Sequence, residues 1–334
     1  MFSEDELVDA IRRVLAGETP GVRLGVGDDA AVVEAGSGDL VLTSDMLVEG
    51  ADFRLGRTSP RDLGYKSIVV NVSDIAAMAA SPRYALVSLG LPPDVDLPWV
   101  VELYGGMRTA CEEYALTIVG GDLSSAGQVV VSVSVAGSAA PGKVVARSGA
   151  RPGDRVVVTG VLGAAAGGLV LAELAPQEAA KAASSGWGRA LLEAAARPVA
   201  RVGEAQTLAA HGATSMIDVS DGFARDCIRV CEASGVGARI RTADVPVAPE
   251  LASLAEVADV EPLGLALGGG EDFELIATLP LAAVDAARSE LEHRFFVALT
   301  DVGEITDGVE VFEVPAGGGA EVPLEAQGWD HFAR

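Results

Sequence analysis

The sequence predicts two domains of the α/β (α+β) class, each built from a mixed sheet and helices. Its length of 334 residues exceeds that of one ordinary domain, and a hydrophobic content of 49% is enough for two cores. Strand-like and helix-like segments occur in two blocks. Between these blocks, residues 138–154 are rich in Gly, Pro and basic residues. We therefore predict an N-terminal domain over 1–140 and a C-terminal domain over 141–334.

In the first block, a Ser-x-x-Glu capping box starts an amphipathic helix over 3–17. A Ser-Pro pair at 59–60 starts a longer helix, which meets no breaker before the Ser-Pro pair at 81–82. The other predicted elements of this block are strands at 22–33, 39–48, 84–91, 116–121 and 128–137 and a helix at 98–114.

The second block continues the alternation of strands and helices. Residues 176–189 are polar and Ala-rich, and we expect them to form an excursion from the domain. A Gly turn at 268–270, which we expect to be flexible, precedes a strand. The predicted elements are strands at 155–159, 213–219, 236–240 and 273–279 and helices at 162–175, 222–233 and 280–291.

Charge and composition exclude several classes of function. The chain has 48 acidic and 24 basic residues, a net charge of −24. This charge argues against binding nucleic acid or an anionic membrane through a basic surface. No apolar run reaches the ~18 residues of a membrane span, and the N-terminus, MFSEDELVD, is unlike a signal peptide. We expect a cytoplasmic protein.

Cysteine and histidine are too few and too scattered for most catalytic arrangements. The three cysteines lack a zinc-type CxxC, and Cys227 and Cys231, four residues apart, are typical of a buried helix face. The three histidines lie far apart and beside no evident nucleophile, so a Ser-His-Asp hydrolase is disfavoured.

Six short acidic clusters, each attached to an apolar run, are the strongest functional signal. Hard oxygen ligands with almost no His or Cys nearby favour Mg²⁺ or Ca²⁺. Like charges gathered by a fold repel one another unless cations lie among them. The clusters therefore predict a site for several metal ions. They are Gly27-Asp28-Asp29, Thr43-Ser44-Asp45, Asn71-Val72-Ser73-Asp74, Gly120-Gly121-Asp122, Asp218-Val219-Ser220-Asp221-Gly222 and Gly269-Gly270-Glu271-Asp272.

Other interpretations of these motifs are weaker but remain open. Each acidic cluster alone is also typical of a helix N-cap or a turn. An EF-hand loop placed on Gly222 would put apolar residues at ligand positions. The segment at 156–168 imitates a dinucleotide-binding turn, but its glycines do not follow G-x-G-x-x-G. A P-loop motif is missing from the sequence.

Taken in order, the motifs resemble the thiamine-monophosphate kinase family, within the superfamily of aminoimidazole ribonucleotide synthetase and selenophosphate synthetase. The resemblance runs from about Gly25 to Phe332 and covers nearly the whole chain. Selenophosphate synthetases have a reactive Cys or selenocysteine near the N-terminus, whereas this chain has no Cys before Cys111. The motifs are GVGDDAAVV, LTSDMLVEG, GYKSIVVNVSDIAAM, IVGGDLSS, ARSGARPGD, IDVSDG, GGGEDFEL and GWDHF.

The resemblance implies Mg-ATP-dependent phosphorylation of thiamine monophosphate to thiamine diphosphate. It also implies an aminoimidazole ribonucleotide synthetase-like fold, with a homodimer formed through the N-terminal sheet and a C-terminal domain that completes the substrate site. The resemblance assigns the metal shells to Asp29, Thr43, Ser44, Asp45, Asp74, Asp122, Asp218 and Asp221. It assigns ATP contacts to Gly121, Asp122, Arg147, Ser220 and Tyr104, and substrate contacts to Asp52, Glu271 and Trp329.

One position departs from the family, whose members usually have His where this chain has Asp52. The departure implies that another group replaces this contact or that the thiamine end is held differently.

Overall fold

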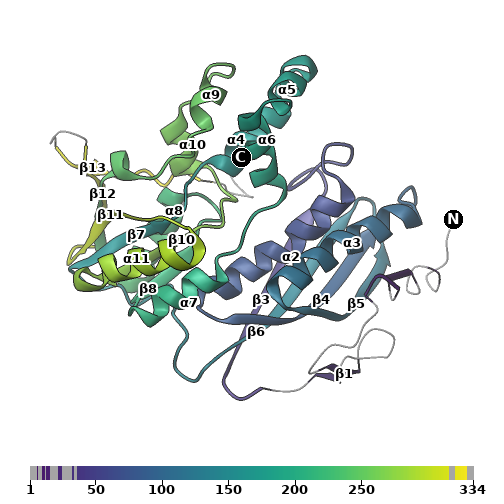
Figure 1. Ribbon diagram of the computed structural model, residues 1–334, viewed down its shortest axis with the longest axis horizontal. Helices are drawn as coiled ribbons and strands as arrows, with labels where there is room; N and C mark the ends of the chain where they lie inside the picture. The colour runs from purple at the N-terminus through teal and green to yellow at the C-terminus, as the bar shows by residue number, and fades with distance from the viewer. Residues whose placement is uncertain are drawn as a thin grey trace. The chain divides into compact units, whose positions relative to one another are not determined.

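The computed structural model describes residues 6, 10, 11, 13–15, 22–24, 32, 33, 36–315 and 320–328. The chain folds into two compact units (Figure 1). Unit 1 comprises Met1–Ile75 and Ala80–Val144, and unit 2 comprises Ala76–Ala79 and Val145–Arg334. The predicted helix over 3–17 lies largely outside the described residues.

Unit 1 contains a four-stranded sheet in the order β3-β6-β4-β5. β6 pairs antiparallel with both β3 and β4, and β4 pairs parallel with β5. The segment 22–33, expected to be one strand, contains two short strands that pair antiparallel, whereas the other predicted strands of this unit are present. Their bounds are Asp39–Val48 (β3), Ser81–Leu91 (β4), Thr117–Ser125 (β5) and Val130–Ala139 (β6), and a separate antiparallel pair consists of Val22–Leu24 (β1) and Val32–Val33 (β2).

Two helices, α2 (Pro60–Ala77) and α3 (Leu97–Tyr114), cover one face of this sheet (Figure 1). The helices pack closely because glycines face a neighbouring backbone. A Cβ atom at Gly64 would lie 1.9 Å from the Leu103 carbonyl oxygen, and one at Gly106 would lie 1.8 Å from the Arg61 carbonyl oxygen. The close packing fixes α2 against α3, and α2 carries one of the predicted site residues.

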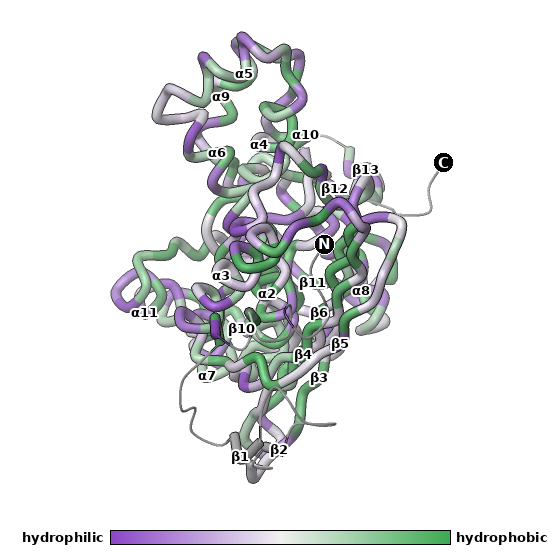
Figure 2. The backbone as a smooth tube through the Cα atoms, turned by 90° about the vertical axis from the view of Figure 1, so that its right-hand side faces the viewer, coloured by the Kyte–Doolittle hydropathy of each residue, from purple (hydrophilic) through white to green (hydrophobic). Residues whose placement is uncertain are grey.

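The opposite face of the unit 1 sheet is apolar and exposed. Alternate side chains of a strand point to opposite faces, and those that point away from the helices include Leu40, Leu42, Met46 and Leu86. They are 68%, 69%, 58% and 48% exposed. Figure 2 shows the hydrophobic stretches of β3 and β4 in green. An apolar face of this kind is typical of an interaction surface.

Unit 2 contains a seven-stranded sheet in the order β13-β12-β9-β11-β7-β10-β8. All neighbours pair antiparallel except β12 and β9, which are parallel. The strands are Asp154–Thr159 (β7), Ser215–Asp218 (β8), Gly237–Ile240 (β9), Leu275–Pro280 (β10), Leu299–Thr306 (β11), Val311–Glu313 (β12) and Val322–Pro323 (β13).

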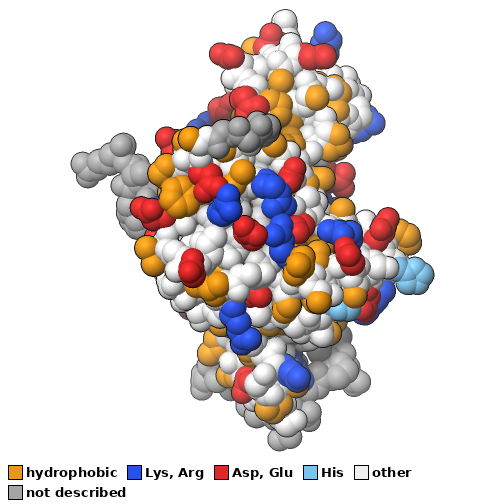
Figure 3. All heavy atoms as spheres, turned by 90° about the vertical axis from the view of Figure 1, so that its left-hand side faces the viewer, with side chains coloured by type: hydrophobic (Ala, Val, Ile, Leu, Met, Phe, Trp, Pro, Cys, Tyr) orange, Lys and Arg blue, Asp and Glu red, His pale blue; other side chains and the backbone are white. Residues whose placement is uncertain are grey.

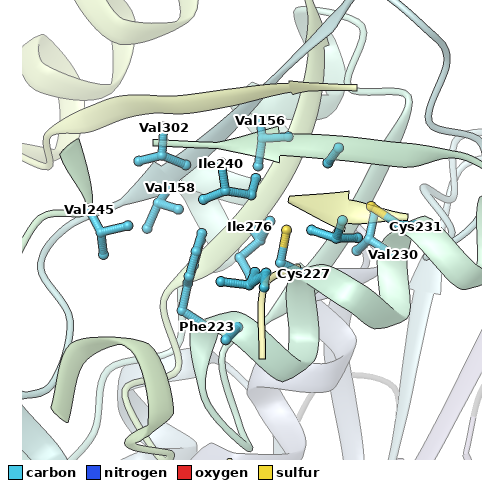
Figure 4. Close-up of a cluster of buried hydrophobic side chains, with 14 of the residues drawn as sticks. Val156, Val158, Phe223, Cys227, Val230, Cys231, Ile240, Val245, Ile276 and Val302 are labelled. Atoms are coloured by element: carbon cyan, nitrogen blue, oxygen red, sulfur yellow. The ribbon is translucent and has the colours of Figure 1, made fainter. Parts of the chain in front are cut away.

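Helices pack on both faces of the unit 2 sheet. On one face, the α8 side chains Phe223, Cys227 and Cys231 pack against strand residues such as Val156 and Val158 (Figure 4). On the other face, α7 and α11 cover β7, β8 and β10. The helices are Ala164–Glu173 (α4), Pro176–Ala183 (α5), Gly186–Ala196 (α6), Val202–Ala210 (α7), Phe223–Ser234 (α8), Leu251–Ala255 (α9), Pro262–Gly268 (α10) and Val284–Phe295 (α11).

The Ala-rich segment at 176–189 differs from the expected polar excursion. It forms α5 and the start of α6, which pack with α4 around Leu171, Leu191 and Leu251. A Cβ atom at Gly168 would lie 2.2 Å from the Leu191 carbonyl oxygen, so α4 and α6 are in close backbone contact. Alanine is the best helix former, so the Ala-rich composition is the signal that could have identified these helices.

Charged side chains alternate in sign across three neighbouring strands of the sheet, with basic residues on β7 and β9 and acidic residues on β11 between them. Arg155 pairs with Asp301 through two hydrogen bonds of 2.9 Å and with Glu304 at 3.1 Å. Arg241 also donates to Asp301, and Arg239 contacts Glu304. Figure 3 shows basic side chains beside acidic ones on the face that it displays.

Among the described residues, no helix is long and apolar enough to cross a membrane.

Candidate active site

A carboxylate pair lies in unit 1 where α2 packs on β3. Odd-numbered residues of β3 face the helix, which brings Asp45 to Asp74. Asn71, on the same helix, is fully buried and is fixed by its own hydrogen bonds. Its amide nitrogen donates to the Ser67 carbonyl at 3.1 Å, and its oxygen accepts from the Asp45 backbone N–H at 3.1 Å. The Thr43 hydroxyl donates to Asp74. The structure thus brings Thr43, Asp45 and Asp74 together.

Asp74 perturbs the titration of Asp45. Burial, the negative charge of Asp74 and a hydrogen bond to Asp74 together raise the pKa of Asp45 to about 7. A pair that shares a proton near neutral pH is suited to exchange that proton for a divalent cation. Two carboxylates and a hydroxyl match the oxygen ligands of Mg²⁺, which usually takes one or two carboxylates with phosphate oxygens and water. The donor set therefore fits magnesium.

Asp29, predicted to join this pair, lies outside the described residues. Within the part of the chain that the structure describes, no group of three or more His, Cys, Asp or Glu side chains is gathered as a metal site. The described donors are therefore two carboxylates and a hydroxyl, which leaves most of a magnesium coordination shell to other ligands.

Ser44 and Asp122 lie on the other face of the sheet from Asp45. The Ser44 hydroxyl is 2.9 Å from the Ser134 hydroxyl. In the strand register, Asp122 of β5 lies opposite Ser88 of β4, and Ser88 lies opposite Ser132 of β6. Ser132 in turn lies opposite Met46 of β3, so Asp122 is level with Met46. β3 and β5 are the two edges of the sheet, and three strand spacings of ~4.8 Å separate them by ~14 Å. Asp122 of the same chain therefore cannot share a metal ion with Ser44 or Asp45.

Three further predicted residues of unit 1 have structural contacts of their own. The Asp52 carboxylate accepts from the Val48 backbone N–H at 2.8 Å and closes the turn after β3. Tyr104 is buried on α3, and burial raises the pKa of its phenol. A Cβ atom at Gly121 would lie 1.8 Å from the Val87 carbonyl oxygen, so this position requires glycine for β4 and β5 to pair.

The main acidic loop of unit 2 follows β8, which ends at the buried Asp218. The backbone N–H groups of Ser220, Asp221 and Gly222 all donate to one oxygen of Asp226, at 3.0, 3.0 and 3.2 Å. Asp226 is fully buried in the first turn of α8. The backbone donors that could have cradled a phosphate are therefore occupied by a side chain of the protein.

Arg229 completes this loop. Its guanidinium contacts the second oxygen of Asp226 at 2.7 Å and the carboxylate of Asp221 at 2.6 Å. Sequence reasoning missed both Asp226 and Arg229. An acidic residue in a first helical turn and an arginine three residues later are signals that could have identified them.

The loop at 268–274 runs beside the acidic loop. Glu271 N–H donates to the Ser220 carbonyl at 2.9 Å, and Phe273 N–H donates to the Val219 carbonyl at 2.9 Å. Glu271 and Phe273 have positive φ angles of 68° and 51°. The preceding glycines are tightly packed, because a Cβ atom at Gly270 would lie 2.4 Å from the Ser220 carbonyl oxygen. The expected glycine turn is therefore closely packed against the acidic loop.

Arg147 and the C-terminal segment also lie beside β8 and its loop. The Met216 N–H donates to the carbonyl of Ala146, so the exposed Arg147 lies along the edge of the unit 2 sheet. A Cβ atom at Gly328 would lie 2.6 Å from the Asp221 carbonyl oxygen. Trp329, the next residue, is outside the described residues. Unit 2 therefore brings Asp218, Ser220, Asp221, Glu271 and Gly328 together.

Two protein families match the chain. The N-terminal domain of AIR synthase related proteins matches residues 27–139, and the C-terminal domain of the same proteins matches residues 151–314. Together these matches include every predicted site residue except Trp329 and Arg147.

Individual relatives are similar over nearly the full length. A thiamine-monophosphate kinase of Aquifex aeolicus is 34% identical over 331 residues, which is 99% of this chain and 98% of the relative. A structure described as AaThiL complexed with AMPPCP and TMP superposes with a TM-score of 0.77 at 33% identity, over 98% of this chain and 97% of its own. A thiamine-monophosphate kinase structure from Stenotrophomonas maltophilia K279a reaches a TM-score of 0.82 at 31% identity, over 96% of this chain and 98% of its own.

Replacing Asp74 with Asn should stabilise the metal-free protein. The raised pKa of Asp45 means that the folded state binds more protons than the unfolded state between about pH 4 and 7. Stability is therefore lost as the pH rises through this range. Removing the neighbouring charge should recover about 1 kcal/mol at pH 8, or about 2–4 °C in Tm, and less at pH 5. Thermal unfolding in EDTA measures this difference.

Asp94→Asn is the matched control, because it removes the same charge from an exposed turn. Its Tm should stay within about 1 °C of the unmodified protein at both pH values. A lower Tm for Asp74→Asn than for the unmodified protein at pH 8 would contradict the proposed repulsion.

Proposed function

We infer that the chain, which belongs to the thiamine-monophosphate kinase family of AIR synthase related proteins, transfers a phosphoryl group from ATP to thiamine monophosphate. The product is thiamine diphosphate. The similarity over almost the entire chain carries this function, and the Asp45–Asp74 pair supports it because phosphoryl transfer from ATP needs divalent cations.

The reaction that fits these residues is a direct in-line transfer with several Mg²⁺ ions. Magnesium, when bound, neutralises the charge that the two phosphate groups bring together. In unit 1, Asp45, Asp74 and the Thr43 hydroxyl would be magnesium ligands. In unit 2, Asp218 and Asp221 would be magnesium ligands. Asp29 belongs to the same proposed set. The number of proposed ligands favours more than one ion.

The acceptor in this reaction needs no general base. Its phosphate monoester has a second pKa of about 6 and is largely dianionic at neutral pH. Alignment and charge neutralisation are therefore the main contributions of the protein. The exposed Arg147 would bind ATP phosphates through its forked donors. Gly121, Ser220 and Tyr104 complete the proposed ATP contacts.

The protein is proposed to form a homodimer through the unit 1 sheet. The exposed leucines and Met46 on that face would be buried by a second copy. A two-fold axis through the face would also bring an edge strand β5 of one copy toward β3 of the other. Asp122 of the second copy would then complete the metal shell beside Ser44, which Asp122 of the same chain cannot reach.

The kinase function predicts a specific product. Mass spectrometry after incubation with Mg-ATP and thiamine monophosphate should detect one added phosphoryl group on the thiamine ester. Asp45→Asn and Asp74→Asn should each lower kcat by at least about 100-fold, because a lost metal ligand removes transition-state charge stabilisation. Full turnover in EDTA, or a nicotinamide absorbance change without ATP, would reject the proposal.

An active site that is completed by Asp122 of the second copy predicts that inactive variants complement one another. When Asp45→Asn and Asp122→Asn chains are co-refolded, half the dimers are mixed, and each mixed dimer has one intact site. About a quarter of wild-type activity should return. The matched control is a mixture of Asp45→Asn chains with Asp74→Asn chains. Because both residues serve the site of their own chain, every site in this mixture lacks one ligand, and the mixture should remain inactive. Lack of complementation in the first mixture, or monomers in light scattering, would contradict the proposed dimer site.

Trp329 is proposed to contact the thiamine end of the acceptor, with Glu271 and Asp52 nearby. The thiazolium is a permanent cation, and a Trp face binds a cation with roughly 0.5–2 kcal/mol. Trp329→Ala should therefore raise the KM for thiamine monophosphate by about 2- to 30-fold, with the KM for ATP changed by less than about twofold. Initial-rate kinetics with each substrate varied in turn tests this. Equal increases for both substrates would instead indicate a structural role.

A further inference from the structure

The backbone at Glu271 is held in an uncommon conformation by contacts on both sides of it. Non-glycine residues with positive φ are rare and persist only where the surroundings hold them. Here two of them, Glu271 and Phe273, flank Asp272. On the N-terminal side, the Glu271 N–H donates to the Ser220 carbonyl at 2.9 Å, and a Cβ atom at Gly270 would lie 2.4 Å from the same oxygen.

Asp272 fixes the loop from the other side. Its carboxylate accepts from the N–H groups of Gly163 at 2.7 Å and Ala165 at 3.2 Å, at the start of α4. Gly163 is the N-cap residue of this helix, and as a glycine it has no side chain that could accept these hydrogen bonds. The cap therefore comes from a loop more than 100 residues away in sequence, and it ties the position of Glu271 to α4.

A buried ion pair fixes the same loop where it enters β10. The Glu274 carboxylate is 5% exposed and accepts from Arg201 Nε at 2.8 Å and from the Thr159 hydroxyl at 2.6 Å. Arg201 Nη2 donates to its other oxygen. Gly160 gives this carboxylate its space, because a Cβ atom there would lie 2.0 Å from Glu274 Oε1. Both ends of the segment 272–274 are thus anchored to other elements.

We propose that Asp272 and Arg201 are positioning residues that hold Glu271 toward the thiamine end of the acceptor. The inference rests on the proposed function, in which Glu271 contacts thiamine monophosphate. The direction of a side chain follows its backbone φ. If either anchor is lost, residue 271 can return to the common negative φ region, and its carboxylate then points elsewhere. Neither anchor needs to touch the substrate.

A double-mutant cycle separates positioning from a general structural effect. The variants are Asp272→Asn, Glu271→Gln and the pair together, assayed at pH 8 with each substrate varied. Asp272→Asn should raise the KM for thiamine monophosphate about tenfold and the KM for ATP by less than about twofold. In the Glu271→Gln background, the same change should have less than about a twofold effect. Arg201→Lys, which removes the forked contact, should behave in the same way and serves if Asp272→Asn fails to fold.

Ser185→Ala is the matched control, because it removes a side-chain cap from α6, where Ser185 accepts from the Gly188 N–H. It should lower Tm without a selective change in either KM. An Asp272→Asn effect of equal size in both backgrounds would overturn the positioning role while leaving the substrate contact standing. An unchanged KM for thiamine monophosphate in Glu271→Gln would overturn both. Failure to form thiamine diphosphate in the unmodified protein would reject the proposed function itself.

Discussion

The repulsion between Asp45 and Asp74 is the interaction around which unit 1 is organised. The two carboxylates come from different elements, and the packing of α2 on β3 together with the hydrogen bonds of Thr43 and Asn71 keeps them adjacent. Asn71 joins the backbone of β3 to the helix, and Gly64 allows α2 and α3 to pack closely against each other. Holding the two carboxylates together lowers the stability of the folded protein when both are ionised. Such a loss of stability is common where function needs an unfavourable local arrangement.

The acidic residues of the chain serve two distinct purposes, and their partners separate them. Asp226 and Asp272 accept backbone N–H groups, and Glu274 is paired with Arg201, so these residues hold loops in place. Asp45 and Asp74 face one another instead. The net charge of −24 is thus only partly a property of the site. Structural acids lie within a few residues of proposed ligand acids, which makes the ligand loops rigid.

Much of the fold could be predicted from local pattern, whereas the site could be predicted only as a set of residues. The strand at 39–48 and the helix from Pro60 follow alternation and capping signals that act over a few residues. The opposite orientations of Ser44 and Asp45, and the distance of Asp122 from both, depend on strand order, which periodicity does not encode. The left-handed backbone at Glu271 depends on long-range contacts with Gly163 and Ser220. Local sequence rules favour glycine at positive φ angles, so they predict a left-handed backbone at the neighbouring glycines and not at Glu271.

The strand order β3-β6-β4-β5 also constrains how the protein is made. β3 and β4 are not neighbours, and the strand that joins them, β6, is the last of the four to be synthesised. Until Val130–Ala139 has left the ribosome, both earlier strands have unpaired edges and exposed leucines. Unpaired edges of this kind favour association between nascent chains. β3 therefore cannot join the sheet before β6 has been made, although it is the first of the four strands in the chain.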